Sequence, residues 1–165
     1  MSDKVKILIV DDEPVVRQAF VRILSSERCS VEAVSNGADA LRRMREQAFD
    51  VVLLDVRMPG MDGMTVLRAI KENWPESEVI IVTGYGTIES AIEALKRGSY
   101  DYLQKPINFE RLKILIDRII EKRNLQLENF LFKRRLKDRY NFDQLVGKSG
   151  KMQQIYEVID RISSG

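Results

Sequence analysis

Three aspartates stand directly after apolar segments of the chain. Asp11 and Asp12 follow residues 7–10, and Asp55 follows residues 51–54. If these segments are neighbouring parallel strands, the three carboxylates converge at one edge of a sheet, where unpaired anions repel one another. A hard divalent cation resolves that repulsion, and Mg²⁺ with oxygen ligands is the natural candidate. Asp55 is then the best nucleophile for phosphoryl transfer, whereas Asp11 and Asp12 are better placed as metal ligands.

A hydroxyl and a lysine extend this cluster of acids. Thr83 follows the apolar segment 79–82, and Lys105 follows the weaker candidate strand 99–103. A lysine can neutralise the oxygens of a phosphoryl group during its transfer, as a metal ion does. One aspartate after a strand is common as a helix cap. Five polar residues gathered after the ends of four of the five predicted strands, however, indicate a site for phosphoryl transfer.

The composition of the chain excludes several other kinds of site. The chain has no histidine, so it can hold neither a Ser-His-Asp triad nor a histidine zinc site nor a phosphohistidine. Its single cysteine, Cys29, excludes an internal disulfide, which favours a cytoplasmic location. No apolar run exceeds four residues and no signal core follows the first residues, so neither a membrane span nor secretion is expected.

The elements that must position the acids can be inferred from hydrophobic patterns. Three apolar segments of four residues are too short for helices and rich in β-branched side chains, which predicts buried strands of a parallel sheet. They are residues 7–10, 51–54 and 79–82. Two segments that alternate with polar residues, 30–34 and 99–103, are expected at the edges. Helical spacing fills the gaps, with Pro14 suited to the start of the first helix and Gly98 to the end of the fourth.

This alternation predicts an α/β fold of five strand–helix units around a parallel sheet. The flavodoxin-like strand order 2-1-3-4-5 puts the three most apolar strands inside and the other two at the edges. It also makes the first and third strands neighbours, with the ligand site beyond their carboxyl ends. The chain is uneven in charge: residues 1–108 carry a net charge of −3 and residues 109–165 one of +5, so the two parts are expected to do different work.

A long helix is predicted after the fifth strand. Residues 109–139 contain no Gly or Pro, and a helix of this length outruns a domain of about 110 residues. Its first apolar residues are expected to pack on the sheet: Leu112, Leu115, Ile116 and Ile119. A 4-3-4 spacing farther along predicts the seam of a coiled-coil dimer in which an asparagine sets the register. The seam residues are Ile120, Asn124, Leu127 and Leu131. Residues 142–150 are expected to form a loop, and residues 151–162 an amphipathic segment.

Several motifs in this order resemble those of response-regulator receiver domains of the CheY type. They are Val10-Asp11-Asp12-Glu13, the stretch Leu54-Asp55-Val56-Arg57-Met58-Pro59-Gly60-Met61-Asp62-Gly63, Val82-Thr83-Gly84 and Tyr102-Leu103-Gln104-Lys105-Pro106. The resemblance covers residues 1–122. It implies that Asp55 accepts a phosphoryl group from a partner histidine kinase. It also implies that Asp12, Asp55 and the backbone carbonyl of Arg57 bind Mg²⁺, with Asp11 acting through water.

The same resemblance implies a switch. Lys105 is expected to contact the phosphoryl group, and Thr83 to hydrogen-bond it and move inward. Tyr102 is expected to change rotamer together with Thr83. The peptide bond between Lys105 and Pro106 is expected to be cis, which would aim the lysine at the site.

The residues after 141 resemble a second protein family. Residues 142–149 and Met152 resemble the opening of the AAA+ domain of NtrC-type, sigma-54-dependent activators, in which a long helix joins the receiver to the ATPase. Gly147-Lys148-Ser149 mimics the end of a Walker A motif, but Phe142 stands where that motif needs glycine, so ATP binding is not expected. The implied organisation is a receiver domain over 1–122, a linker helix over 123–140 and a truncated AAA+ start over 141–165.

The implied function is a phosphorylation-dependent switch, not an enzyme, that controls dimerisation of a transcriptional activator through the linker. The homodimer is expected to use the fourth helix, fifth strand and fifth helix, or the linker itself. A phosphatase that forms an aspartyl-phosphate is the alternative, although such enzymes have an Asp-x-Asp pair and Asp55 is followed by Val56-Arg57. The basic run 133–139 lacks an aromatic stacking platform, so a solvated helix face is favoured over direct DNA binding.

Overall fold

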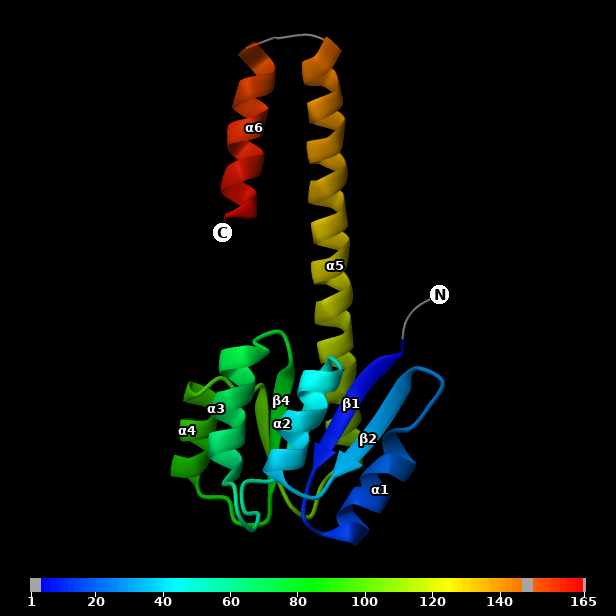
Figure 1. Ribbon diagram of the computed structural model, residues 1–165, viewed down its shortest axis with the longest axis vertical. Helices are drawn as coiled ribbons and strands as arrows, with labels where there is room; N and C mark the ends of the chain where they lie inside the picture. Colours follow the sequence, from blue (N-terminus) through cyan, green and yellow to red (C-terminus); the bar gives the residue numbers. More distant parts are fainter. Residues whose placement is uncertain (1–3, 147–149, 165) are drawn as a thin grey trace. The chain divides into compact units, whose positions relative to one another are not determined.

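The computed structural model describes residues 4–146 and 150–164, with side chains described over 4–141 and 157–164. The chain divides into two compact units, and the division lies between Ile119 and Ile120. The first unit is built on five parallel strands in the order β2-β1-β3-β4-β5 (Figure 1), which confirms the predicted α/β fold and its strand order. The strands are β1 (Val5–Val10), β2 (Cys29–Val34), β3 (Val51–Leu54), β4 (Glu78–Thr83) and β5 (Asp101–Gln104).

The register between β1 and β3 brings the acids together. Val10 lies opposite Leu54, so the next residue of each strand, Asp11 or Asp55, leaves the sheet beside the other. The Asp55 N–H donates to the carbonyl of Val10 at 2.9 Å, which extends the ladder one step beyond the strands. β1, β3 and β4 are almost wholly buried, whereas β2 is partly exposed, as expected for a parallel sheet with polar edges.

Four short helices connect the strands, and their ends follow the local sequence. They are α1 (Pro14–Leu24), α2 (Gly37–Glu46), α3 (Gly63–Asn73) and α4 (Ile88–Lys96). Pro14 occupies the first turn of α1, as predicted. The Asn36 side chain caps α2, and Thr87 and Ser90 form a capping box on α4. Gly98, with a φ of 98°, follows the end of α4, in the left-handed conformation that glycine adopts without strain.

The sheet is covered on both faces. Leu8, Val10 and Leu54 belong to a buried cluster that also contains residues of α2, α3 and α4. On the other face, Phe20 of α1 meets Phe109, the first residue of the next helix, with ring centroids 5.9 Å apart. These two layers hold the sheet rigidly, so the loops at the carboxyl ends of the strands are presented from a fixed frame.

The helix α5 runs from Phe109 to Val146, farther than predicted. Its first apolar residues are buried, which confirms that they pack within the first unit: Leu112, Leu115, Ile116 and Ile119. The expectation of a loop from residue 142 is wrong for residues 142–146, which are helical, because no glycine or proline interrupts the chain before Gly147. The Walker-like residues 147–149 lie outside the described residues. The segment expected to be amphipathic forms the helix α6 (Gly150–Ser163).

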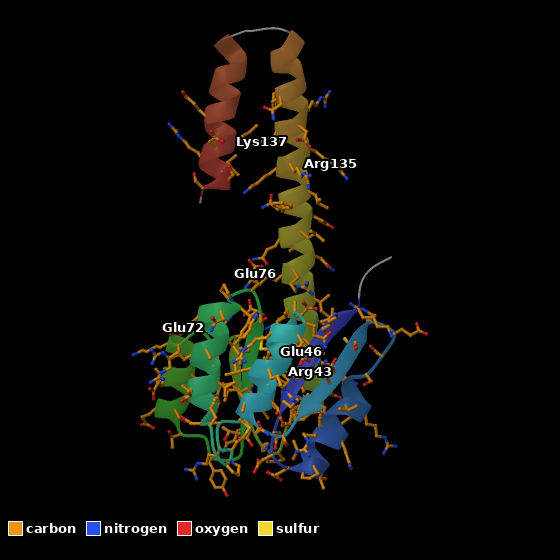
Figure 2. The ribbon with its side chains drawn as sticks, viewed as in Figure 1. Arg43, Glu46, Glu72, Glu76, Arg135 and Lys137 are labelled. Carbon is orange, nitrogen blue, oxygen red and sulfur yellow. The ribbon has the colours of Figure 1, made fainter. Side chains whose placement is uncertain are left out.

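The second unit contains the rest of α5 together with α6. Among the predicted seam residues, Ile120 is buried, whereas Asn124 is exposed and Leu127 and Leu131 expose 57% and 40% of their surface. Charged side chains of α5, among them Arg135 and Lys137, are exposed and project from the helix (Figure 2). Over the described ranges, every helix is either too short or too polar to cross a bilayer.

Candidate functional site

The three predicted aspartates meet at the carboxyl edge of the sheet. One carboxylate oxygen from each of Asp11, Asp12 and Asp55 lies within 4.8 Å of the others. Asp11 and Asp55 are 2% and 6% exposed, and Asp12 is half-buried. The prediction that these acids converge is therefore confirmed. They converge because the register of β1 and β3 places Val10 opposite Leu54.

Asp11 is held from several sides. Its Oδ1 accepts the Glu13 N–H at 2.9 Å, and its Oδ2 accepts Lys105 Nζ at 2.7 Å. Its backbone N–H donates to the carbonyl of Val34 at 3.2 Å. Its backbone carbonyl accepts a hydrogen bond from the guanidinium of Arg17 at 2.8 Å. These contacts fix both the peptide and the carboxylate of Asp11.

Asp55 shares the same lysine. Lys105 Nζ lies 3.2 Å from Asp55 Oδ2, while Asp55 Oδ1 accepts the Arg57 N–H at 3.1 Å. Lys105 reaches the site because its backbone N–H donates to the carbonyl of Thr83 at 2.9 Å, at the end of β4. The peptide bond between Lys105 and Pro106 is cis, as predicted. One cation thus bridges two buried carboxylates.

The electrostatics of the cluster are set by burial and by neighbouring charges. Burial raises the pKa of Asp55 above its ordinary value, and the charge of Asp11 adds to this, although Lys105 acts in the opposite direction. Burial alone would lower the pKa of Lys105, but the hydrogen bond and charge of Asp11 outweigh it, so the pKa rises. Lys105 therefore stays protonated at neutral pH, while burial disfavours the charged form of Asp55.

The donor set fits a hard divalent cation. Three carboxylates supply oxygen ligands, and a single lysine does not balance three negative charges. Within the described part of the chain, Asp12 has no hydrogen bond or ion pair, so its oxygens are available to a metal. Arg57 contacts Asp55 through its N–H, and a role for its carbonyl stays a prediction.

The two predicted switch residues, Thr83 and Tyr102, are not members of the acid cluster. Thr83 is fully buried at the end of β4, and its hydroxyl accepts the Tyr85 N–H at 3.2 Å. The hydroxyl of Tyr102 lies 3.2 Å from Ser90 Oγ, on the first turn of α4. Among the described contacts, no hydrogen bond joins Thr83 or Tyr102 to the acids. Their roles as phosphoryl contact and relay stay predictions.

Sequence reasoning missed several contacts that shape the site. A Cβ atom on Gly63 would lie 2.3 Å from the carbonyl oxygen of Asp55, so only glycine permits this close approach. Arg17 holds the Asp11 carbonyl, and its position on the first turns of α1, six residues after Asp11, was the only available signal. Arg57 stacks on Tyr85 across two loops, which no local pattern reveals.

Comparison with known proteins shows which family this sequence resembles. The family model described as the response regulator receiver domain matches residues 7–117. A response regulator of Rickettsia bellii described as NtrX-like is 37% identical over 162 residues, which cover 97% of this chain and 33% of that protein. NtrC of Proteus hauseri, named as a DNA-binding transcriptional regulator, is 32% identical over 165 residues, with 97% of this chain and 33% of that protein covered. The chain spans about a third of the length of these relatives.

A solved structure gives the same result for the fold. The crystal structure of the receiver domain of NtrX from Brucella abortus superposes with a TM-score of 0.65 at 36% sequence identity. The match covers 70% of this chain and 98% of that domain. The similarity is therefore to a whole, separately folded domain.

Proposed function

This chain belongs to the response regulator receiver domain family, and from that premise we propose that Asp55 accepts a phosphoryl group from a histidine kinase. Receiver domains of two-component response regulators are regulatory switches, not catalysts. The observation that carries the proposal is the ion pair between Asp55 and Lys105, at 3.2 Å, in a buried cluster that includes Asp11. A lysine already beside the acceptor can neutralise the negative charge that a phosphoryl group brings.

The transfer can be written with the residues of this chain. An oxygen of the Asp55 carboxylate forms a bond to phosphorus while the phosphorus–nitrogen bond of the kinase phosphohistidine breaks. The leaving imidazole keeps the electron pair of that bond and takes a proton from solvent. Lys105 keeps its own proton and donates hydrogen bonds to the phosphoryl oxygens, in keeping with its raised pKa.

Asp12 and Asp55 are the residues proposed to hold Mg²⁺ directly, with the Arg57 carbonyl completing the site and Asp11 acting through water. When bound, the ion neutralises the charge that develops on the transferring oxygens. The availability of the Asp12 carboxylate beside two buried acids supports this assignment.

Thr83 and Tyr102 are proposed to transmit the phosphorylated state. The Thr83 hydroxyl accepts the Tyr85 N–H and keeps its proton available for a phosphoryl oxygen. Movement of Thr83 toward the phosphoryl group would shift the loop that leads into α4, where Ser90 contacts the hydroxyl of Tyr102. A local charge would in this way bias the surface formed by α4, β5 and α5.

The wider role is a proposal about a longer protein. We propose a receiver over 1–122, a linker helix over 123–140 and the start of an AAA+ domain over 141–165, in a cytoplasmic, NtrC-type transcriptional activator. Exposed apolar residues support a homodimer: Ile88, Ile92 and Leu95 on α4, and Leu127 and Leu131 on α5. Phosphorylation would change the dimer and so control the activator.

Phosphorylation of the whole chain by acetyl phosphate tests this proposal. Intact mass spectrometry in the presence of Mg²⁺ should show one phosphoryl group on the wild type and none on Asp55→Asn, and removal of Mg²⁺ with EDTA should abolish labelling. Asp62→Asn is the matched control, because Asp62 is an exposed aspartate of the same loop whose side chain caps no backbone group. Equal labelling of Asp55→Asn and the wild type would reject Asp55 as the acceptor. Sustained turnover of phosphomonoesters would favour the phosphatase instead.

A further inference from the structure

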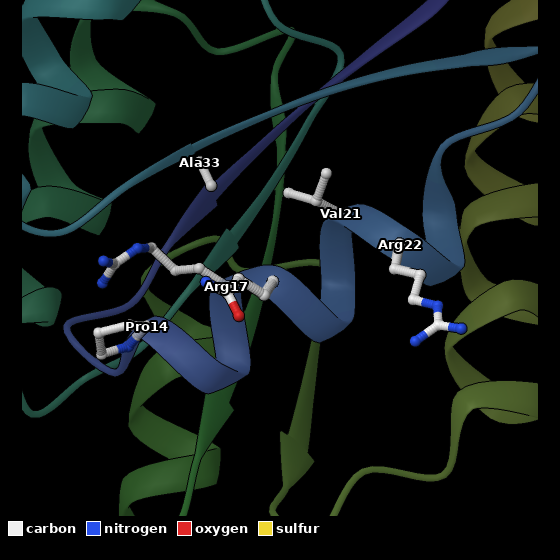
Figure 3. Close-up of a pocket in the computed structure, with 6 residues that line it drawn as sticks. Pro14, Arg17, Val21, Arg22 and Ala33 are labelled. Carbon is white, nitrogen blue, oxygen red and sulfur yellow. The ribbon is translucent and has the colours of Figure 1, made fainter.

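Arg17 makes a contact that its place in the sequence does not require. It lies on α1, and its backbone N–H donates to the carbonyl of Glu13 in an ordinary i→i−4 helical hydrogen bond. Its side chain turns back past the start of the helix, and one guanidinium nitrogen donates to the backbone carbonyl of Asp11 at 2.8 Å. Arg17 is half-buried and lines a shallow groove between α1 and β2 together with Pro14 and Ala33 (Figure 3).

This hydrogen bond acts on the peptide group that joins the first two acids. The carbonyl oxygen of Asp11 and the Cα of Asp12 belong to one rigid plane, because the peptide bond does not rotate freely. Holding the oxygen therefore sets the direction in which Asp12 leaves the sheet edge. Asp12 needs such support, since its side chain is the one acid of the cluster without a polar contact in the described part of the chain.

The contact also leaves the carboxylates free. Arg17 binds a carbonyl, whereas an arginine paired with Asp11 or Asp12 itself would occupy oxygens that a metal needs. Asp11 already accepts hydrogen bonds from the Glu13 N–H and from Lys105 on its own side chain. Arg17 is thus placed to orient the cluster without competing for its ligand atoms.

We propose that Arg17 is a positioning residue that orients Asp12 for binding a divalent cation, by holding the peptide between Asp11 and Asp12. The inference rests on the proposed function of the acid cluster, which it deepens by adding a residue outside the ligand set. Groups that orient metal ligands in this way contribute about 10–100-fold to metal affinity in other sites.

The sign of the effect separates positioning from charge. Loss of a positive charge near an acidic site should by itself tighten the binding of Mg²⁺, because it removes repulsion. Loss of an orienting hydrogen bond should weaken that binding. Arg22 is the matched control, since it lines the same groove, is exposed and has no polar contact with the acids in the described structure.

Isothermal titration of Mg²⁺ into the complete, unphosphorylated chain decides between these effects. Arg17→Met should weaken Mg²⁺ binding about tenfold, whereas Arg22→Met should leave it unchanged or slightly tighter. Arg17→Lys keeps the charge but loses the planar guanidinium, and it should lie between Arg17→Met and the wild type. The labelling rate with acetyl phosphate at saturating Mg²⁺ should return close to that of the wild type for all three variants.

The possible outcomes separate the role of Arg17 from the proposed function of Asp55. Equal Mg²⁺ affinity of Arg17→Met, Arg22→Met and the wild type overturns the role of Arg17 and leaves Asp55 as acceptor untouched. A labelling rate of Arg17→Met that stays low at saturating Mg²⁺ also overturns it. A wild type that binds no Mg²⁺ overturns both proposals. Far-UV circular dichroism verifies folding, and if Arg17→Met is unfolded, unchanged Mg²⁺ affinity in Arg17→Lys overturns the inference.

Discussion

The guanidinium of Arg57 lies over the ring of Tyr85, with its central carbon 4.3 Å from the ring centroid. The two residues stand on different loops, each two positions after a residue of the site. The Arg57 N–H donates to Asp55, and the Tyr85 N–H donates to the hydroxyl of Thr83. The stack therefore ties the loop of the acceptor to the loop of the proposed switch residue.

The energy of this stack can be measured with a double-mutant cycle. We expect Arg57→Ala, Tyr85→Ala and the double variant to give a coupling of about 0.5–1 kcal/mol in urea unfolding, as for other exposed cation–π pairs. Tyr85→Phe keeps the aromatic face and should retain most of the coupling. Strictly additive effects of the two alanine variants would show that the loops are not tied in solution.

The stability of the metal-free protein should depend on the charge of Asp55. The pKa of Asp55 in the folded chain is raised above the ordinary value of 3.8. At a pH between 3.8 and that raised pKa, the folded chain therefore holds a proton that the unfolded chain has released. Stability therefore falls as the pH rises through this interval. Asp55→Asn removes the buried charge and should raise the urea midpoint above that of the wild type at pH 7. The gap between the two midpoints should shrink as the pH falls toward 3.8, because Asp55 of the wild type then becomes protonated.

Two comparisons make this pH experiment decisive. Asp62→Asn changes an exposed aspartate of the same loop and should not raise the midpoint at pH 7. Added Mg²⁺ should stabilise the wild type more than Asp55→Asn, because only the wild type offers the full carboxylate cluster. An Asp55→Asn variant less stable than the wild type at pH 7 without metal would contradict the predicted sign.

Alanine at position 63 should disturb the backbone of the acceptor. The added Cβ would lie 2.3 Å from the carbonyl oxygen of Asp55 and 2.5 Å from the Cα of Val56, and backbone atoms cannot rotate away. We expect a loss of about 1–3 kcal/mol in thermal unfolding, typical of overpacking, together with slower labelling by acetyl phosphate. Gly84→Ala adds the same atom in open space and should be nearly neutral. Equal stability of the two variants would refute this prediction.

Alanine at position 86 should move a side chain instead of the backbone. Its Cβ would lie 2.6 Å from the hydroxyl of Tyr102, at the free end of that side chain. We expect Gly86→Ala to displace the hydroxyl from Ser90 and to cost about the net value of one hydrogen bond, 0.5–1.5 kcal/mol. The NMR signals of the Tyr102 ring should shift in Gly86→Ala and stay in place in Gly84→Ala. An unmoved ring would argue against a tight fit between Gly86 and Tyr102.

Much of the fold was predictable because its signals are local. Apolar segments of four residues mark the buried strands where turn residues bound them, and Pro14 and Gly98 act on the helix ends next to them. The predicted end of α5 was wrong. The glycines at 147 and 150 favour a loop, but residues 142–146 contain nothing that stops a helix.

The amino-acid sequence alone determined the kinds of groups at the site and the strand ends that carry them, because hydrophobic periodicity and residue type are properties of short stretches. Tertiary structure decided what these groups contact. Lys105 bridges Asp11 and Asp55, and Arg17 holds the Asp11 carbonyl, only because the register of the sheet and the packing of α1 fix distances between residues far apart in the chain. Hydrogen bonds and close contacts act over a few ångströms, and spacing along a sequence does not specify distances on that scale.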